Sequence, residues 1–217
     1  MSLRRAANTL LNLLYPPRCP FCDQLVPGDE PALCPQCARS LPRAEGTFSA
    51  EGFDTGVFLL YYEGTVRESL LRYKFSGCAA YSRVYGEMLA QYVAEALSGD
   101  FDLVSYVPVS RRRRALRGYD QAKLLAQRVA EVYHVRPATT LTKIRHNPAQ
   151  SSMKDARARR RNVHGVYRAV HPEAFAGRRV LLLDDISTTG ATLSEAARTL
   201  RVAGAEKVVC AVLAKPR

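Results

Sequence analysis

The stretch 179–192 constrains the fold of this chain more than any other segment. It reads Arg-Val-Leu-Leu-Leu-Asp-Asp-Ile-Ser-Thr-Thr-Gly-Ala-Thr. The apolar run predicts a buried parallel strand over 179–183, which leads into Asp184 and Asp185. A loop of small residues follows, and leucines and alanines at helical spacing then predict an amphipathic helix. This order predicts an open α/β sheet, whose ligands bind at the carboxyl ends of the strands.

The loop that begins at Ser187 has the composition of an anion-binding site. A loop of small residues that enters a helix points backbone N–H groups and the positive end of the helix dipole at a phosphate. Asp184 and Asp185 can accept hydrogen bonds from the vicinal hydroxyls of a sugar, so the combination predicts a site for a ribose 5-phosphate. A buried strand that merely ends in an Asp turn is the alternative. A Walker B strand looks similar, but no G-x-x-x-x-G-K-[ST] loop occurs in the sequence.

These residues resemble the motif that binds phosphoribosyl pyrophosphate (PRPP) in type I phosphoribosyltransferases. The motif has four apolar residues, two acidic residues, a short mixed segment and Thr-Gly-small-Thr, and every position is filled. Nearly the whole chain resembles the ComF/GntX branch of that superfamily, with its four-cysteine finger, an Arg-Gly-aromatic-Asn-Gln segment at 117–121 and a segment marked by Gln150, Arg159 and Asn162. Two positions depart from the pattern: Asp120 replaces Asn, and His146 stands where Thr is expected.

The resemblance implies the type I phosphoribosyltransferase fold and a PRPP-binding phosphoribosyltransferase that requires Mg²⁺ with PRPP. It places Asp184 and Asp185 at the catalytic centre and Arg111 in the turn that binds pyrophosphate. The residues expected around the 5-phosphate are Ser187, Thr188, Thr189, Gly190, Ala191 and Thr192. The ComF branch further implies a role in natural competence and DNA uptake, with a membrane-associated DNA translocase as a partner.

Three parts are expected along the chain: an N-terminal helix and finger (1–45), a hood (46–100) and a PRPP-binding core (101–217). In the hood, a strand is predicted at 57–62 and helices at 65–73 and 81–97. In the core, strands are predicted at 102–109, 139–144, 166–170, 179–183 and 207–213, and a helix at 121–135 capped by Asp120. Their alternation predicts one parallel sheet.

The long polar loop 145–165 is interpreted as a lid. Lys74 is interpreted as an exposed lysine at a helix end, with a substrate contact as the alternative.

Four cysteines near the N-terminus, Cys19, Cys22, Cys34 and Cys37, follow the pattern C-x2-C-x11-C-x2-C. Two such pairs predict a tetrahedral zinc site, and it is structural because no ligand position stays open. A segment of about 30 residues buries too little surface to fold alone, so metal would supply the missing stability. Disulfides are the alternative, although a reducing cytosol disfavours them. The other two cysteines, Cys78 and Cys210, are predicted to be small buried residues.

Positive charge is concentrated in residues 101–170, which hold 16 Lys/Arg against 4 Asp/Glu and so account for the net charge of +12. Two clusters dominate, and their arginines are Arg111, Arg112, Arg113, Arg114 and Arg117, then Arg157, Arg159, Arg160 and Arg161, with Lys154 beside the second. Basic clusters beside a phosphate site favour a polyanion: PRPP, pyrophosphate or a nucleic-acid backbone. A solvated basic face is the alternative.

The sequence contains no apolar segment of the roughly 20 residues that a membrane helix requires. Residues 1–15 are interpreted as an amphipathic helix, not as a signal sequence, which predicts a cytoplasmic protein. Two functions stay open. One is phosphoribosyl transfer to an unknown acceptor, and the other is a non-catalytic adaptor that binds single-stranded DNA through the same fold and basic surface.

Overall fold

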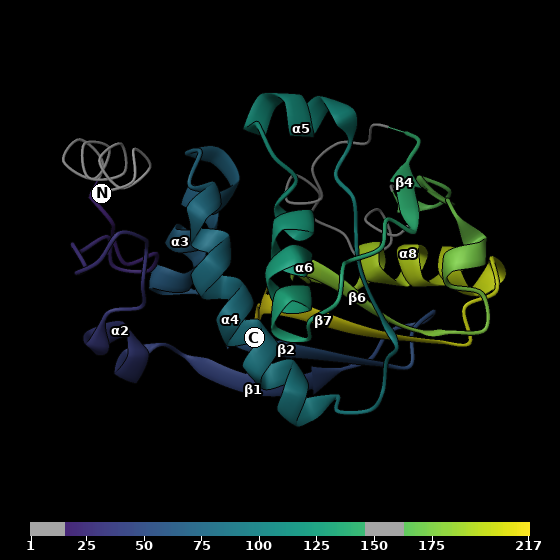
Figure 1. The fold of residues 1–217 in the computed structure, drawn as a ribbon, viewed down its shortest axis with the longest axis horizontal. Helices are drawn as coiled ribbons and strands as arrows, with labels where there is room; N and C mark the ends of the chain where they lie inside the picture. The colour runs from purple at the N-terminus through teal and green to yellow at the C-terminus, as the bar shows by residue number, and fades with distance from the viewer. Residues whose placement is uncertain (1–15, 146–162) are drawn as a thin grey trace.

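The computed structural model describes residues 16–145 and 163–217, in which helices and strands alternate along most of the chain (Figure 1). In order, they are α2 (Pro35–Ser40), β1 (Arg43–Phe48), β2 (Thr55–Tyr61), α3 (Gly64–Phe75), η1 (Ala79–Tyr81), α4 (Ser82–Ala96), β3 (Leu103–Tyr106), α5 (Arg111–Arg117), α6 (Gln121–Val132), β4 (Leu141–Lys143), β5 (Tyr167–Ala169), η3 (Pro172–Ala174), β6 (Arg179–Ile186), α8 (Ala191–Val202) and β7 (Lys207–Lys215). The helix expected at 1–15 and nearly all of the lid expected at 145–165 lie outside the described residues.

Five strands form one mixed sheet in the order β1-β2-β7-β6-β3. The four strands from β2 to β3 are parallel, and β1 is antiparallel to β2 at one edge. β6 and β7 are central because their apolar runs are covered on both faces. The strand expected at 179–183 is therefore confirmed as a parallel strand. It continues to Ile186, so Asp184 and Asp185 lie on the strand itself.

Different helices cover the two faces of this sheet. Side chains alternate along a strand, so Leu181 and Leu183 of β6 pack with α3, α4 and α6, whereas Val180 and Leu182 pack with α8 and the β4–β5 pair. Figure 1 shows α3, α4 and α6 grouped together, with α8 and β4 apart from them. The α/β fold class is confirmed.

Two of the predicted core strands do not join the parallel sheet, which corrects the expectation of a single sheet. β4 and β5 pair antiparallel with each other, with Leu141 opposite Ala169. Each has three residues, and only one residue of each is buried. A strand covered on one face lacks the long apolar run of a central parallel strand, so alternation along the chain alone misplaced them.

The sequence analysis predicted neither the strand β1 nor the helix α5. β1 is a polar edge strand that spans residues 43–48, so the boundary expected at residue 45 falls inside it. α5 contains the first arginine cluster, where a turn was expected. The Ser110 side chain caps its N-terminus, and Gly118, with φ of 82°, follows its last residue. Because α5 buries none of its residues, no apolar periodicity could indicate a helix there.

No helix in the described parts of the chain is long and apolar enough to cross a membrane.

Candidate functional site

The acidic pair lies at the carboxyl edge of β6. Asp185 is only 3% exposed, whereas Asp184 is half-buried. Oδ1 of Asp184 accepts a hydrogen bond of 2.8 Å from the backbone N–H of Asp185. Burial, and then the charge of Asp185, raise the pKa of Asp184 well above its ordinary value. The pair therefore needs a nearby cation to stay ionised.

Lys74, from the last turn of α3, supplies that cation. Its Nζ lies 3.0 Å from Oδ2 of Asp185, and the two side chains are 18% and 5% exposed. The interpretation of Lys74 as an exposed helix-end lysine was wrong, because α3 packs on the sheet with its last turn beside the acidic pair. Removing one partner of such a buried ion pair leaves an uncompensated charge, which makes the contact important for the site.

The loop after β6 offers polar groups that the described residues leave unsatisfied. The N–H of Ser187 donates to the carbonyl of Ala214 in β7, which anchors the loop. Gly190 has a φ of 77° at the N-cap of α8, a conformation that other residues rarely adopt. The hydroxyls of Ser187 and Thr189 are buried and have no hydrogen-bond partner among the described residues. Phosphate oxygens at the N-terminus of α8 would satisfy such groups.

A pocket of about 810 Å³ opens over this edge of the sheet. Among the expected site residues, its lining includes Asp184, Asp185, Thr188, Thr192, Arg112, Arg113 and Arg117. Arg111 and Arg114 are absent from the described lining, as are Ser187, Thr189, Gly190 and Ala191. The second arginine cluster, Arg157, Arg159, Arg160 and Arg161, lies outside the described residues. The pocket thus joins the acidic pair to part of the first basic cluster.

Lys143, at the end of β4, lines the same pocket and was missed by the sequence analysis. Burial, and then the neighbouring charge of Arg113, lower the pKa of its ammonium to about 8. Its Nζ also lies 5.4 Å from the centroid of the Tyr167 ring. Lys143 has the sequence feature that pointed to Asp184, because both are charged residues at the carboxyl end of a predicted strand.

Asp120 stands where the ComF/GntX pattern has Asn, and it joins two elements next to Val109 and Gln121, which line the pocket. Its Oδ2 accepts the backbone N–H of Val109 at 3.0 Å, and its Oδ1 accepts that of Lys123 at 3.2 Å. The cap predicted for α6 is confirmed. An Asn has a single carboxamide oxygen, so the carboxylate lets separate oxygens hold the turn after β3 and the start of α6.

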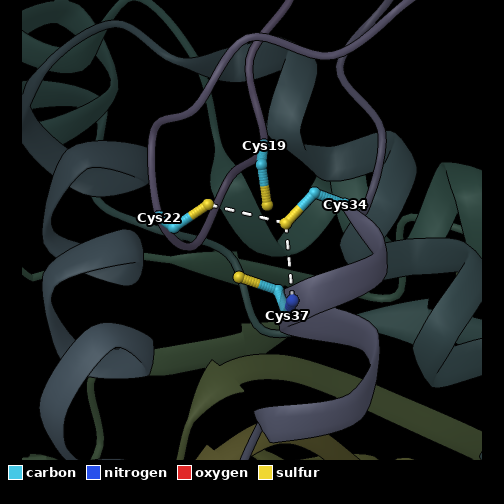
Figure 2. Close-up of side chains that lie close together, drawn as sticks. All are labelled: Cys19, Cys22, Cys34 and Cys37. Atoms are coloured by element: carbon cyan, nitrogen blue, oxygen red, sulfur yellow. Dashed lines mark hydrogen bonds between the residues drawn. The ribbon is translucent and has the colours of Figure 1, made fainter.

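The four cysteines of the finger converge, as Figure 2 shows. Their sulfur atoms all lie within 4.8 Å of one another, and Sγ of Cys22 lies 3.6 Å from Sγ of Cys34. Zn–S bonds of about 2.3 Å in a tetrahedron place sulfurs about 3.8 Å apart, so the set fits zinc. The N–H of Cys37 also donates to Sγ of Cys34 at 3.4 Å. Cys210 is buried as expected, whereas Cys78 is half-buried.

Comparison with known families matches this description. A phosphoribosyl transferase domain covers residues 117–217, and a double zinc ribbon domain covers residues 10–48. With the parallel sheet and the converging cysteines, these matches define a phosphoribosyltransferase-fold protein that carries an N-terminal zinc ribbon. The four thiolates are the ligand set of a structural zinc site. More specifically, the chain belongs to the ComF family.

Similar curated proteins include competence protein F of Haemophilus influenzae, 36% identical over 47% of this chain and 45% of that protein. The DNA utilization protein YhgH of Escherichia coli O6:H1 is 28% identical over 88% of this chain and 86% of its own length. Competence protein ComFC of Bacillus subtilis is 30% identical over 64% of this chain and 55% of its own length. The chain thus spans less than half of competence protein F but most of YhgH.

Two solved structures resemble part of the chain. The glutamine PRPP amidotransferase from B. subtilis has a TM-score of 0.43 and 25% identity, over 62% of this chain and 26% of that one. The allosteric regulatory enzyme of purine biosynthesis has a TM-score of 0.44 and 21% identity, over 65% of this chain and 29% of that one.

Proposed function

We propose that this protein binds PRPP together with Mg²⁺ in the pocket and transfers its phosphoribosyl group to an acceptor. The observation that carries the proposal is the meeting, at the end of β6, of a carboxylate pair with buried hydroxyls that lack partners among the described residues. Asp184 and Asp185 accept hydrogen bonds from the ribose hydroxyls. The loop 187–192 binds the 5-phosphate through its hydroxyls and the backbone at the start of α8.

The positively charged side chains of the pocket stabilise the departing pyrophosphate. Arg112 and Arg113 line the pocket, so they take the role that the sequence analysis gave to Arg111. Together with Lys143 they place positive charge where negative charge develops when the bond to the anomeric carbon breaks. Positioning of donor and acceptor in line then supplies much of the rate increase.

The ligand set of the pocket fits a Mg²⁺ ion that arrives with the pyrophosphate. In residues 16–145 and 163–217, only the four cysteines form a group of three or more candidate metal ligands. Mg²⁺ typically uses one or two carboxylates, water and substrate phosphates, so no dedicated protein cage is needed. When bound, the ion neutralises charge on the pyrophosphate.

We place this activity in natural competence and DNA uptake, in the cytoplasm, with a membrane-associated DNA translocase as a partner. The names of the relatives, competence protein F, ComFC and DNA utilization protein, support this role. A zinc site of four thiolates is also suited to a reducing compartment.

A second candidate function, single-stranded DNA binding without turnover, is favoured by α5. Its arginines other than Arg113 form no ion pair with a described residue, and the helix buries none of its residues. At the pocket mouth, the guanidinium of Arg117 lies 4.9 Å from the centroid of the Phe75 ring, which is 68% exposed. Exposed aromatic rings beside arginines bind unpaired bases by stacking.

Calorimetry with PRPP and Mg²⁺ tests the main proposal on Asp184→Asn. This variant leaves the Lys74–Asp185 pair in place, so we expect little change in melting temperature. The loss of a charge-assisted hydrogen bond, worth about 1.5–3 kcal/mol, should weaken PRPP binding about tenfold or more. Glu131→Gln, at an exposed carboxylate of α6, is the control and should bind like the wild type. Unchanged PRPP affinity in Asp184→Asn would remove the acidic pair from the site.

A further inference from the structure

Three consecutive residues in the last turn of α3 reach three different neighbours. Successive side chains of an α-helix point about 100° apart, because 3.6 residues complete a turn. Arg72 contacts the cysteine finger, Tyr73 contacts the start of α6, and Lys74 pairs with Asp185. One helical turn therefore connects the zinc ribbon to the acidic pair.

Arg72 contacts the finger at its first knuckle, the segment from Cys19 to Cys22. One guanidinium nitrogen donates to the carbonyls of Pro20 and Phe21, at 2.8 and 2.9 Å. These two residues lie between Cys19 and Cys22, so zinc binding and the position of their carbonyls are linked. The hydroxyl of Ser69, one turn earlier in α3, also donates to the carbonyl of Pro20. Two backbone carbonyls of the finger thus accept hydrogen bonds from side chains of one helix, α3.

Packing strengthens this contact. Phe21 is 1% exposed and lies edge-on to Tyr85 of α4, with ring centroids 5.6 Å apart. The buried residues of the finger and of α3 belong to one continuous hydrophobic cluster. A shift of the knuckle would therefore displace α3, because densely packed interiors transmit displacement.

On its other side the same turn is fixed by tyrosines. Tyr73 is fully buried, and its hydroxyl donates to the carbonyl of Gln121 at 2.9 Å. The Tyr119 hydroxyl donates to the carbonyl of Tyr73. Lys74 follows directly, and its long side chain must reach a carboxylate that is almost completely buried. Because the tyrosine contacts hold the backbone of this turn, the Lys74 side chain has less conformational freedom than a lysine on a mobile turn.

We propose that Arg72 is a positioning residue that couples the zinc ribbon to the PRPP site, because it fixes the turn of α3 that brings Lys74 to Asp185. The proposal rests on the proposed function, in which the ionised acidic pair binds the ribose. In this arrangement the ribbon is a part of the site as well as a stabilising module. Arg72 itself is not among the residues that line the pocket.

A double-mutant cycle tests this coupling. PRPP affinity in the presence of Mg²⁺ is measured by calorimetry for Arg72→Met, Lys74→Met and the double variant, with zinc content and melting temperature recorded for each. We expect Lys74→Met to weaken binding about tenfold and Arg72→Met about threefold or more. The double variant should bind no more weakly than Lys74→Met, because Arg72 acts through Lys74. Additive losses, or wild-type affinity in Arg72→Met, would overturn the proposal.

Two matched controls and a conservative variant exclude a general loss of structure. Arg67→Met on α3 and Lys123→Met on α6 change exposed side chains and should bind PRPP like the wild type. Arg72→Lys can still donate to a knuckle carbonyl and should restore part of the affinity. If Arg72→Met folds poorly, Arg72→Gln, an uncharged and shorter side chain, takes its place in the cycle. Arg72→Lys that binds no better than Arg72→Met would count against the carbonyl contacts.

A spectroscopic measurement separates failure of this proposal from failure of the proposed function. The ¹⁵N signal of a buried, ion-paired lysine ammonium is followed by NMR without any ligand, and is assigned by its loss in Lys74→Met. Arg72→Met should broaden or remove the signal, whereas Arg67→Met should leave it unchanged. If the wild type fails to bind PRPP but this pattern appears, only the proposed function falls. A Lys74 signal unchanged in Arg72→Met overturns the coupling whatever PRPP does.

Discussion

Lys74 and Lys143 both bring positive charge to the pocket, but their surroundings give them different properties. Lys74 is paired with Asp185 at 3.0 Å. Lys143 lies beside Arg113, and its buried ammonium has a pKa lowered to about 8. A lysine that loses its proton near pH 8 would make anion binding sensitive to pH in a range where exposed carboxylates and arginines keep their charge.

This difference predicts a pH dependence of PRPP binding. Lys143 is charged below its pKa of about 8 and becomes neutral above it, so affinity should fall as the pH rises from 7 to 9. Lys143→Arg stays charged throughout this range and should flatten the curve. Calorimetry in buffers of different ionisation enthalpy measures both the affinity and the proton uptake. An equally steep decline in Lys143→Arg would assign the pH dependence to another group.

Among the elements, α5 has the most unusual composition, with five arginines in seven residues and none of them buried. Its two sides differ, because Arg112, Arg113 and Arg117 line the pocket whereas Arg111 and Arg114 do not. One short helix thus has arginines that line the pocket and arginines that lie outside it. This difference arises because side chains at successive positions of a helix point in different directions.

Two paired variants separate these roles. If α5 also follows a DNA backbone, Arg111→Ala with Arg114→Ala should weaken single-stranded DNA binding and flatten its log–log salt dependence by up to about 1.4, at about 0.7 per phosphate contact. PRPP affinity should stay nearly constant. Arg112→Ala with Arg113→Ala should instead weaken PRPP binding. Titrations of both ligands at several salt concentrations measure this, and loss of PRPP alone in both variants would argue against DNA binding by α5.

At the scale of the whole molecule, the zinc ribbon is continuous with the domain that it precedes. Cys19, Cys34 and Cys37 share a hydrophobic cluster with α3, α4 and α6. The sheet also crosses the expected domain boundaries, since β2 pairs with β7. Loss of the metal should therefore reach beyond the first 45 residues.

Elemental analysis should find about one zinc per chain, as expected for a set of four thiolates. Cys34→Ser should lower the zinc content and, because the ribbon shares the core, reduce the melting temperature by about 4 °C or more. Cys78→Ser, at a half-buried cysteine outside the four-cysteine set, is the matched control. Full zinc retention and normal melting in Cys34→Ser would contradict a structural site.

Local patterns in the sequence determined the central strand with Asp184 and Asp185, the loop that enters α8, the cap at Asp120 and the four converging cysteines. Each of these depends on residues close in the chain, or on a metal-ligand spacing. Tertiary structure alone decided the pairing of β4 with β5, the burial of Lys74 against Asp185, the contact of Arg72 with the finger and the place of Lys143. The reason is physical: these contacts join segments far apart in sequence, and burial and electrostatic environment are properties of the packed molecule.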